Sequence, residues 1–212
     1  MPILGGPIRE PPRAIIFDIG RVIVQVDLAR SFGTFGKRDG LSTEQVWRAL
    51  ETDSRWADWQ EGRITPQDWH KHLCKKFHLS LTFEEFCEHW NRVLDPMPIL
   101  PEALFESLAR TCRLALLSNT DPIHVAHIEA TFPFVRHFPV RVYSCRVGSS
   151  KPAPAIYHHA LRELDATPEE ALYIDDVREN AAAAAHLGMM GFHFTSPDDL
   201  LSEFSRLGLW KS

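Results

Sequence analysis

Short, mostly apolar runs recur along the chain, and helical patterns separate them. The runs are Ala14–Phe17, Leu114–Leu117, Val140–Tyr143, Ala171–Ile174 and Gly191–Phe194. Continuous apolar runs, as opposed to alternating ones, are typical of parallel strands covered on both faces. We therefore predict five buried strands.

The segments between these runs have apolar residues at helical spacing, often after a proline or a capping residue. They are Pro101–Arg110, Pro122–Thr131, Pro154–Leu164, Val177–Leu187 and a last helix that begins at Ser196-Pro197. Alternation of strands and helices is typical of a parallel sheet with helices on its faces. The sequence thus predicts an α/β fold with a Rossmann-like parallel sheet.

One long stretch, residues 28–100, breaks this alternation because its pattern is helical throughout. Ser42, Thr65 and Thr82 each precede a helical pattern in the way that an N-cap does, and five of the six tryptophans lie here. We expect an inserted, small α-helical cap domain with its own apolar centre. The α/β core then comprises residues 13–27 and 101–212, and the Gly- and Pro-containing residues 1–12 form a flexible lead-in.

Composition narrows the possible partners and the location. The chain has 212 residues with 23 Lys and Arg against 28 Asp and Glu, a net charge of −5, which argues against a nucleic-acid partner. No apolar run approaches the roughly 20 residues that span a bilayer, and no secretory signal pattern opens the chain. The four cysteines lack CxxC spacing. We expect a cytoplasmic protein with reduced thiols and no membrane partner.

Polar residues follow three of the predicted strands. Asp18 follows the first, Ser118 the second and the Asp175-Asp176 pair the fourth, while Lys151 precedes a helix. The carboxyl ends of parallel strands meet at one edge of a sheet, where ligands bind. Each residue alone is more often a cap, a turn or a surface residue. Their occurrence together in this order makes chance a poor explanation.

Three crowded carboxylates repel one another unless a divalent cation binds them. Oxygen ligands select Mg²⁺ as that cofactor, usually together with phosphate oxygens of the substrate. A carboxylate beside the metal can attack phosphorus, while Lys151 and the Ser118 hydroxyl hold the phosphoryl oxygens. Arg21 can pair with a phosphate or a substrate carboxylate, although an exposed loop arginine is an equally common interpretation.

Four segments of the sequence resemble the motifs of the haloacid dehalogenase (HAD) superfamily of hydrolases. They are AIIFDIGRVIV, LALLSNTD, SSKPAPAIY and LYIDDVREN, in the order of the family's four motifs, and the resemblance covers the chain after the lead-in. Residues 60–65 and 96–98 also resemble the helical cap of one branch. In that branch the first motif often reads FDLGNV. The branch includes enzymes similar to sugar-1-phosphate phosphatases.

The resemblance implies a role for each matching residue. Asp18 corresponds to the nucleophile and a metal ligand, and Ser118 and Lys151 to catalytic groups that also bind the phosphoryl group. The remaining matches are Asn119, which contacts phosphate or substrate, and Gly20, Asp175 and Asp176, which serve the metal, Gly20 through its carbonyl. Asn180 would support the metal site from a second layer.

Gly20 departs from the common pattern, because most phosphatases of the superfamily have a second Asp two residues after the nucleophile. That Asp protonates the leaving oxygen and then activates water. Its loss leaves three possibilities: substrates with good leaving groups, a proton donor from elsewhere such as the cap, or a slow or inactive site. The first two are favoured, since the FDLGNV-like branch shares this glycine.

The resulting hypothesis is a Mg²⁺-dependent phosphatase that acts on a small phosphorylated metabolite through an aspartyl-phosphate intermediate. The alternatives are a 2-haloacid dehalogenase-like hydrolase and a weakly active or non-catalytic phosphometabolite-binding module. We expect a monomer or homodimer. Four cap residues are candidates to face the site when the cap closes: Trp56, Trp59, Gln60 and Arg63.

Overall fold

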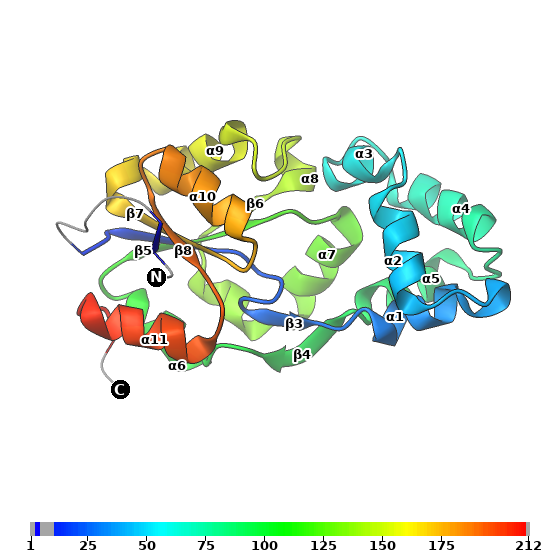
Figure 1. Cartoon of the computed structure of the whole chain (residues 1–212), viewed down its shortest axis with the longest axis horizontal. Coiled ribbons are helices and arrows are strands. Elements are labelled where there is room, and N and C mark those ends of the chain that lie inside the picture. The colour runs from blue at the N-terminus through cyan, green and yellow to red at the C-terminus, as the bar shows by residue number, and fades with distance from the viewer. Residues whose placement is uncertain (1–2, 5–10, 211–212) are drawn as a thin grey trace.

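A six-stranded sheet forms the centre of the core (Figure 1). The computed structural model describes residues 3–4 and 11–210. The strand order is β1-β8-β7-β2-β5-β6. The strands are β1 (Ile3–Leu4), β2 (Ala14–Phe17), β5 (Arg113–Ser118), β6 (Val140–Tyr143), β7 (Ala171–Asp175) and β8 (Met190–His193). The last five are mutually parallel, which confirms the predicted sheet.

The N-terminal segment differs from the expected flexible lead-in. Ile3 and Leu4 form β1, which pairs antiparallel with β8 through Phe192 and Gly191. Residues 5–10 lie outside the described part of the chain. The predicted lead-in therefore contains one edge strand of the sheet.

Helices cover both faces of this sheet. One face packs against α9 (Pro154–Leu164) and α10 (Arg178–His186), and the other against α6 (Glu102–Leu108), α7 (Pro122–Thr131) and α11 (Pro197–Arg206). Alternate side chains of β2 serve the two faces, as the two-residue period of a strand requires. Ile16 packs with α9 and α10, while Phe17 packs with α6 and α11.

The short elements are α8 (Ser144–Val147) and the 3₁₀ turns η1 (Lys37–Asp39), η2 (Pro133–His137) and η3 (Pro168–Glu170).

Five helices form the cap at one end of the molecule (Figure 1). They are α1 (Ala29–Phe35), α2 (Thr43–Glu51), α3 (Trp56–Gln60), α4 (Pro66–Lys76) and α5 (Phe83–Asn91). Ser42 and Thr82 form capping boxes at α2 and α5, and Thr65 caps α4. The local signals for these three helix starts are therefore confirmed.

The expectation of an all-helical insert is wrong at its C-terminal end. Residues Leu94–Pro98 form β4, which pairs antiparallel with β3 (Val24–Val26). Two prolines within this segment, Pro96 and Pro98, lack the amide hydrogen that a helix needs. The chain enters and leaves the cap through this two-stranded ribbon.

The apolar interior of the cap is continuous with one side of the core. Trp59 and Trp69 are fully buried and stacked, with ring centroids 5.3 Å apart, and Trp69 contacts Trp90. The same cluster of buried residues extends to Phe17 on β2. The predicted separate apolar centre is instead one shared core, which fixes the cap against the sheet edge. None of the helices among the described residues is long and apolar enough to cross a membrane.

Candidate active site

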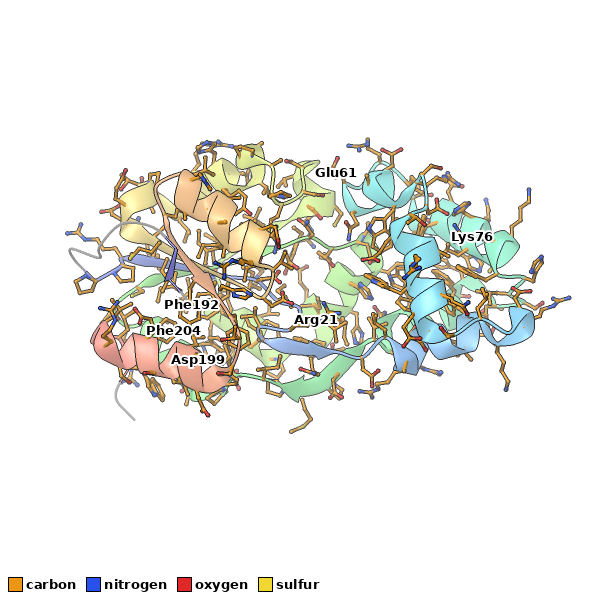
Figure 2. The ribbon with its side chains drawn as sticks, in the orientation of Figure 1. Arg21, Glu61, Lys76, Phe192, Asp199 and Phe204 are labelled. Atoms are coloured by element: carbon orange, nitrogen blue, oxygen red, sulfur yellow. The ribbon has the colours of Figure 1, made fainter. Side chains whose placement is uncertain are left out.

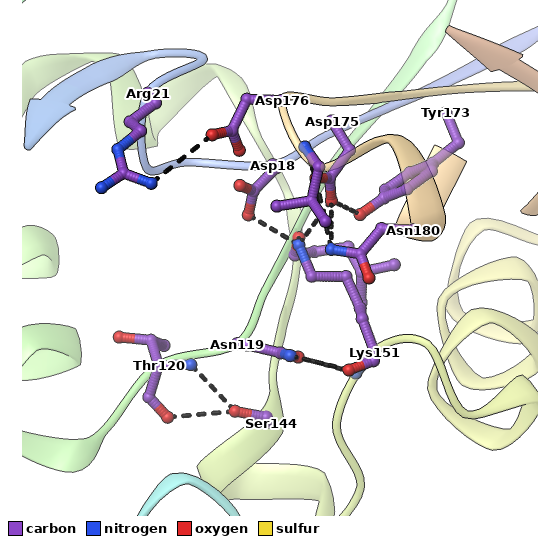
Figure 3. A network of polar contacts seen from close by, with 12 residues as sticks. Asp18, Arg21, Asn119, Thr120, Ser144, Lys151, Tyr173, Asp175, Asp176 and Asn180 are labelled. Carbon is purple, nitrogen blue, oxygen red and sulfur yellow. Dashed lines mark hydrogen bonds and ion pairs between the residues drawn. The ribbon is translucent and has the colours of Figure 1, made fainter. Parts of the chain in front are cut away.

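Three neighbouring strands bring the predicted site residues to one edge of the sheet. β2 lies between β7 and β5, so Asp18, Ser118 and Asp175 lie at adjacent strand ends. Lys151 reaches them from the loop between α8 and α9 (Figure 3). All four side chains are buried. The convergence that the sequence predicted is present in the structure.

Lys151 uses all three of its ammonium hydrogens within this site. Its Nζ donates to Asp18 Oδ1 at 2.8 Å, to Asp175 Oδ2 at 2.8 Å and to the Leu117 carbonyl at 3.3 Å. An ammonium group has three donors. Lys151 therefore bridges the two carboxylates, and a ligand that binds its ammonium group would have to replace one of these hydrogen bonds.

Asp175 is fully buried, and both of its oxygens accept hydrogen bonds. Oδ1 accepts from the Val177 amide at 2.8 Å, and Oδ2 accepts from the Tyr173 hydroxyl and from Lys151. The Asn180 amide donates to both oxygens at 3.2 Å. Asp175 is thereby fixed as the anchor of Lys151. Tyr173 was not among the predicted site residues, although the two-residue period of a strand places it on the same face as Asp175.

Asp176 is half-buried and faces Arg21. Their closest side-chain atoms, Asp176 Oδ2 and Arg21 Nη1, are 3.9 Å apart, and Figure 3 shows the two side chains pointing toward each other. Burial and the nearby Asp175 charge raise the pKa of Asp176. Because the Arg21 guanidinium is half-exposed, it remains accessible to a ligand.

Three carboxylates form a group that fits a hard cation. Asp18, Asp175 and Asp176 each offer an oxygen, and these oxygens lie within 4.8 Å of one another. Lys151 balances only one of the three negative charges. Burial raises the pKa of Asp18 to about 7, against the opposing charge of Lys151. An all-oxygen set with excess negative charge fits Mg²⁺.

Asn119 lines the cleft, but its side-chain amide is engaged with the backbone of Lys151. Nδ2 donates to the Lys151 carbonyl at 2.9 Å, and Oδ1 accepts from the Lys151 amide at 2.7 Å. The predicted substrate-binding residue is thus placed to fix the loop that carries the lysine.

Gly20 lies in the loop after β2, beside Asp18. A Cβ atom added to Gly20 would meet only Val26 Cγ2 within 4 Å, at 3.4 Å, which is an ordinary contact. Its φ is not in the left-handed region, whereas that of the neighbouring Arg21 is +58°. The position therefore has room for a side chain, and the glycine is not required by the backbone there.

A cleft of about 370 Å³ lies between the site and the cap. It is lined by the core residues Asp18, Gly20, Arg21, Ser118, Asn119, Lys151, Asp176, Val177 and Asn180 and the cap-side residues Val26, Leu28, Trp47, Glu51, Trp56 and Gln60. Figure 2 shows Arg21 at the boundary between core and cap. Two larger hollows, of about 560 and 680 Å³, lie elsewhere and contain none of the carboxylates of this site.

The four candidate cap residues divide into two pairs. Trp56 and Gln60 line the cleft, as the hypothesis requires. Trp59 is fully buried inside the cap, and Arg63 pairs with Asp58 and Glu61 at the surface. Only the first pair is positioned to contact a substrate in this conformation.

Hydrogen bonds and a close backbone contact hold the cap against the core. The Ser144 hydroxyl donates to the Gln60 carbonyl at 2.7 Å, and Gly62 packs directly on the Cys145 carbonyl. These contacts were not predicted, since each joins residues more than 80 positions apart.

A second cap–core link, also missed by the sequence reasoning, joins α5 and α7. Trp90 Nε1 donates to Asp121 Oδ2 at 3.0 Å, and His124 Nδ1 lies 2.9 Å from the same oxygen. His124 Nε2 lies 3.1 Å from the Trp90 carbonyl. Burial lowers the pKa of His124, but the Asp121 charge and these hydrogen bonds outweigh it, so that the pKa is raised. The imidazole therefore donates from both nitrogens when protonated.

Comparison with known proteins agrees with this architecture. The family model of haloacid dehalogenase-like hydrolases matches residues 12–188, and the chain belongs to this family. A HAD family enzyme from Bacteroides thetaiotaomicron, solved with magnesium and inorganic phosphate, superimposes with a TM-score of 0.77 at 22% sequence identity. That match covers 91% of this chain and 99% of the other.

Two relatives are similar over most of this chain. A D-ribitol-5-phosphate phosphatase from Bacteroides thetaiotaomicron is 24% identical over 184 residues, which are 84% of this chain and 89% of that protein. The acyl-CoA dehydrogenase family member 10 of Mus musculus is 26% identical over 211 residues. This match covers 92% of the chain but only 19% of the mouse protein, so the chain spans about a fifth of it.

Proposed function

We propose that the protein is a Mg²⁺-dependent phosphatase that hydrolyses a small phosphorylated metabolite through an aspartyl-phosphate on Asp18. The observation that carries this proposal is the contact of Lys151 with both Asp18 and Asp175, beside the further carboxylate of Asp176. A buried carboxylate next to a cation site is suited to attack phosphorus. The named activity of the bacterial relative supports the same reaction class.

Asp18 and Asp176 would hold the metal directly, with the Gly20 carbonyl as a third protein ligand. The bound cation would neutralise charge on the phosphoryl oxygens and on the two aspartates. Asp175 would act on the metal mainly through its neighbours, because both of its oxygens already accept hydrogen bonds. This division assigns different roles to the two adjacent aspartates.

The proposed reaction has two displacement steps at phosphorus. An Asp18 carboxylate oxygen forms a bond to phosphorus, and the bond to the ester oxygen breaks with its electron pair on the leaving group. Lys151 and the Ser118 hydroxyl hold the phosphoryl oxygens during this transfer. Water then attacks the phosphorus and loses its proton to solvent, while the bond between phosphorus and the Asp18 oxygen breaks with its electron pair on the carboxylate. This step releases inorganic phosphate and restores Asp18.

Gly20 cannot supply a proton to the leaving oxygen. General acid catalysis typically contributes about 10²- to 10⁴-fold. We therefore expect the enzyme to be fastest on phosphates whose leaving group needs no protonation, with solvent protonating poorer leaving groups. A slow alkyl phosphatase activity beside a faster aryl or acyl phosphatase activity is the expected signature.

The direct test is release of phosphate from an aryl phosphate such as p-nitrophenyl phosphate. We expect activity with Mg²⁺, loss with a chelator, and loss in Asp18→Asn. Chloride release from 2-chloropropionate, measured in parallel, tests the dehalogenase alternative. Chelator-insensitive turnover, or full activity of Asp18→Asn, would contradict the proposal.

A further inference from the structure

A second, more enclosed pocket of about 150 Å³ extends inward from the catalytic cleft. The two share eight lining residues: Gly20, Val26, Leu28, Trp47, Trp56, Gln60, Ser118 and Asn119. The inner pocket is therefore a continuation of the cleft that holds Asp18, on the side toward the cap.

Aromatic and aliphatic side chains form most of the inner wall. Phe32, Trp90, Val93, Leu94 and Ile128 line it together with Trp47 and Trp56 of the shared part. Trp47 stacks on Phe32, with ring centroids 5.8 Å apart, and meets Trp56 edge to face at 5.7 Å. These rings support one another and present a preformed apolar surface.

The charged side chains in this wall have their hydrogen bonds satisfied within the protein. Asp121 Oδ1 accepts from the amides of Ile123 and His124, and Oδ2 accepts from Trp90. Asp121 Oδ2 and the Trp90 carbonyl also occupy the two ring nitrogens of His124. Asp121 and His124 balance each other's charge, so neither offers a free donor or acceptor to a ligand.

The amide of Asn119 is also occupied, as it pairs with the Lys151 backbone. Gln60, Ser118 and Thr120 are the other polar residues of the lining, against a larger number of aromatic and aliphatic ones. A polyol in this pocket would therefore regain only part of the hydrogen bonds that it loses to water. Such a loss is costly for polar groups, whereas apolar groups gain by leaving water.

Gly20 stands at the passage between the catalytic cleft and this pocket. It lines both, and an added Cβ would point toward Val26, which also lines both. Without a side chain at position 20, the group attached to a phosphate beside Asp18 and Ser118 can extend inward.

From these observations we infer that the inner pocket binds the organic part of the substrate, and that this part is apolar. The inference rests on the proposed phosphatase function and names its substrate class: phosphate monoesters of a small apolar alcohol. A cavity of about 150 Å³ is known to accept a group the size of benzene. The pocket thus fits about five or six carbon atoms.

Alkylphosphonates test this inference without any cleavage step. We would measure the inhibition constants of methyl-, propyl- and pentylphosphonate against Mg²⁺-dependent hydrolysis of p-nitrophenyl phosphate. Burying each methylene should tighten inhibition by about two- to fourfold, up to five or six carbons. Butylphosphonate should bind more tightly than 3,4-dihydroxybutylphosphonate, which has the same chain but two hydroxyl groups.

A tryptophan pair provides the matched variants. Trp47→Gln should weaken pentylphosphonate at least fivefold more than it weakens methylphosphonate, because Trp47 lines the inner pocket as well as the cleft. Trp210→Gln changes a partly buried tryptophan that lines neither part of the cleft, and it should alter neither constant.

The possible failures are distinguishable. Absence of any turnover of the aryl phosphate would overturn the proposed function itself. Turnover with inhibition constants that do not depend on chain length, or a preference for the dihydroxy compound, would overturn the apolar pocket alone. The chain-length series on the unmodified protein decides this even if Trp47→Gln does not fold.

Discussion

Asn119 and Lys151 are joined by two hydrogen bonds, in which the Asn119 amide group donates to the Lys151 carbonyl and accepts from the Lys151 amide. The pair ties the end of β5 to the loop before α9. Because Lys151 then reaches Asp18 and Asp175 with its ammonium group, the position of this positive charge depends on the Asn119 side chain.

Asn119→Ala should therefore lower kcat about 10- to 100-fold, the range found when a supporting residue of a metal site is lost. Because the Lys151 charge holds the pKa of Asp18 down, a displaced Lys151 should also move the acidic limb of the kcat/KM profile to higher pH. The measurement is a pH–rate profile with p-nitrophenyl phosphate. Asn119→Asp keeps the acceptor for the Lys151 amide and should recover part of the rate. An unshifted profile in Asn119→Ala would show that the residue does not position the lysine.

Asp18 should make the metal-free protein less stable as the pH rises. Its pKa of about 7 lies above the ordinary value of 3.8, so between these values the folded state binds the proton more tightly than the unfolded state. The free energy of unfolding should then fall as the pH rises from about 4 to 7.

Asp18→Asn removes this titration and should raise the stability of the metal-free protein at pH 8 by at least about 1 kcal/mol, or about 2–4 °C in Tm. Mg²⁺ should raise the Tm of the unmodified protein more than that of the variant. Thermal unfolding at pH 5 and pH 8, with Mg²⁺ and with a chelator, measures both effects. A variant that is less stable than the unmodified protein at pH 8 would show that the charged, buried Asp18 does not destabilise the metal-free folded state.

The parts of the fold that the sequence predicts well are those with strong local patterns. Ala14–Phe17 is a continuous apolar run, and residues 14–17 are β2 in the structure. Ser42 and Thr82 predict helix starts, because each begins a capping box, a pattern that spans only four residues. The sequence did not predict the strand at residues 94–98, because a short segment with two prolines has neither helical nor strand periodicity.

The same distinction applies to the site, where some residues follow from local patterns and some contacts do not. Strand ends locate Asp18, Ser118 and Asp175, since adjacency in a parallel sheet follows from the fold class. The link between Trp90, Asp121 and His124 requires the docked position of the cap, which depends on shared burial and not on any local signal. Asp121 caps α7 with one carboxylate oxygen and accepts from Trp90 with the other, and only the first of these contacts is local in the sequence.

Gly20→Asp tests whether the lack of a carboxylic acid at position 20 limits the rate with phosphates that have poor leaving groups. The position has room for a side chain and an ordinary backbone conformation, so the substitution should fold. If the new acid protonates the leaving oxygen, the rate with an alkyl phosphate should rise at least tenfold relative to that with p-nitrophenyl phosphate.

Gly20→Asn is the matched control, because it has nearly the same shape but cannot act as a general acid. Because Asn would enter the passage to the inner pocket in the same way as Asp, the ratio of the two rates in Gly20→Asp is compared with the ratio in Gly20→Asn. Equal ratios in both variants would indicate that leaving-group protonation is not what position 20 lacks.

His124 should stabilise the closed cap mainly at low pH. The Asp121 charge raises the pKa of His124 above the ordinary histidine value of 6.5 despite burial. Its contribution is therefore fully present below pH 6.5 and is lost as the pH rises through the raised value. His124→Gln should lower the Tm strongly at pH 6 and less at pH 9.

His186→Gln, which changes an exposed histidine of α10, serves as the control and should have little effect at either pH. Hydrogen exchange can locate the change, with faster exchange expected in α5 and α7 of His124→Gln. A loss of stability in His124→Gln that is equal at both pH values would mean that packing, and not the charge, matters.

Gly62 tests whether the docked position of the cap is the active one. An added Cβ would lie 2.0 Å from the Cys145 carbonyl oxygen, and the residue has a φ of +71°. Gly62→Ala must therefore push α3 away from α8, displacing Trp56 and Gln60 from the cleft. Because a misplacement of about 1 Å can reduce a rate about 10²-fold, we expect kcat/KM to fall by that order.

Gly40 provides the control, since its φ is +65° but nothing lies within 4 Å of an added Cβ. Gly40→Ala has the same backbone strain, about 1–2 kcal/mol, without the clash, so it should lose stability but keep kcat/KM. The comparison of kcat/KM and Tm for the two variants separates strain from displacement. If both lose activity equally, the docking of the cap on Cys145 is not required for turnover.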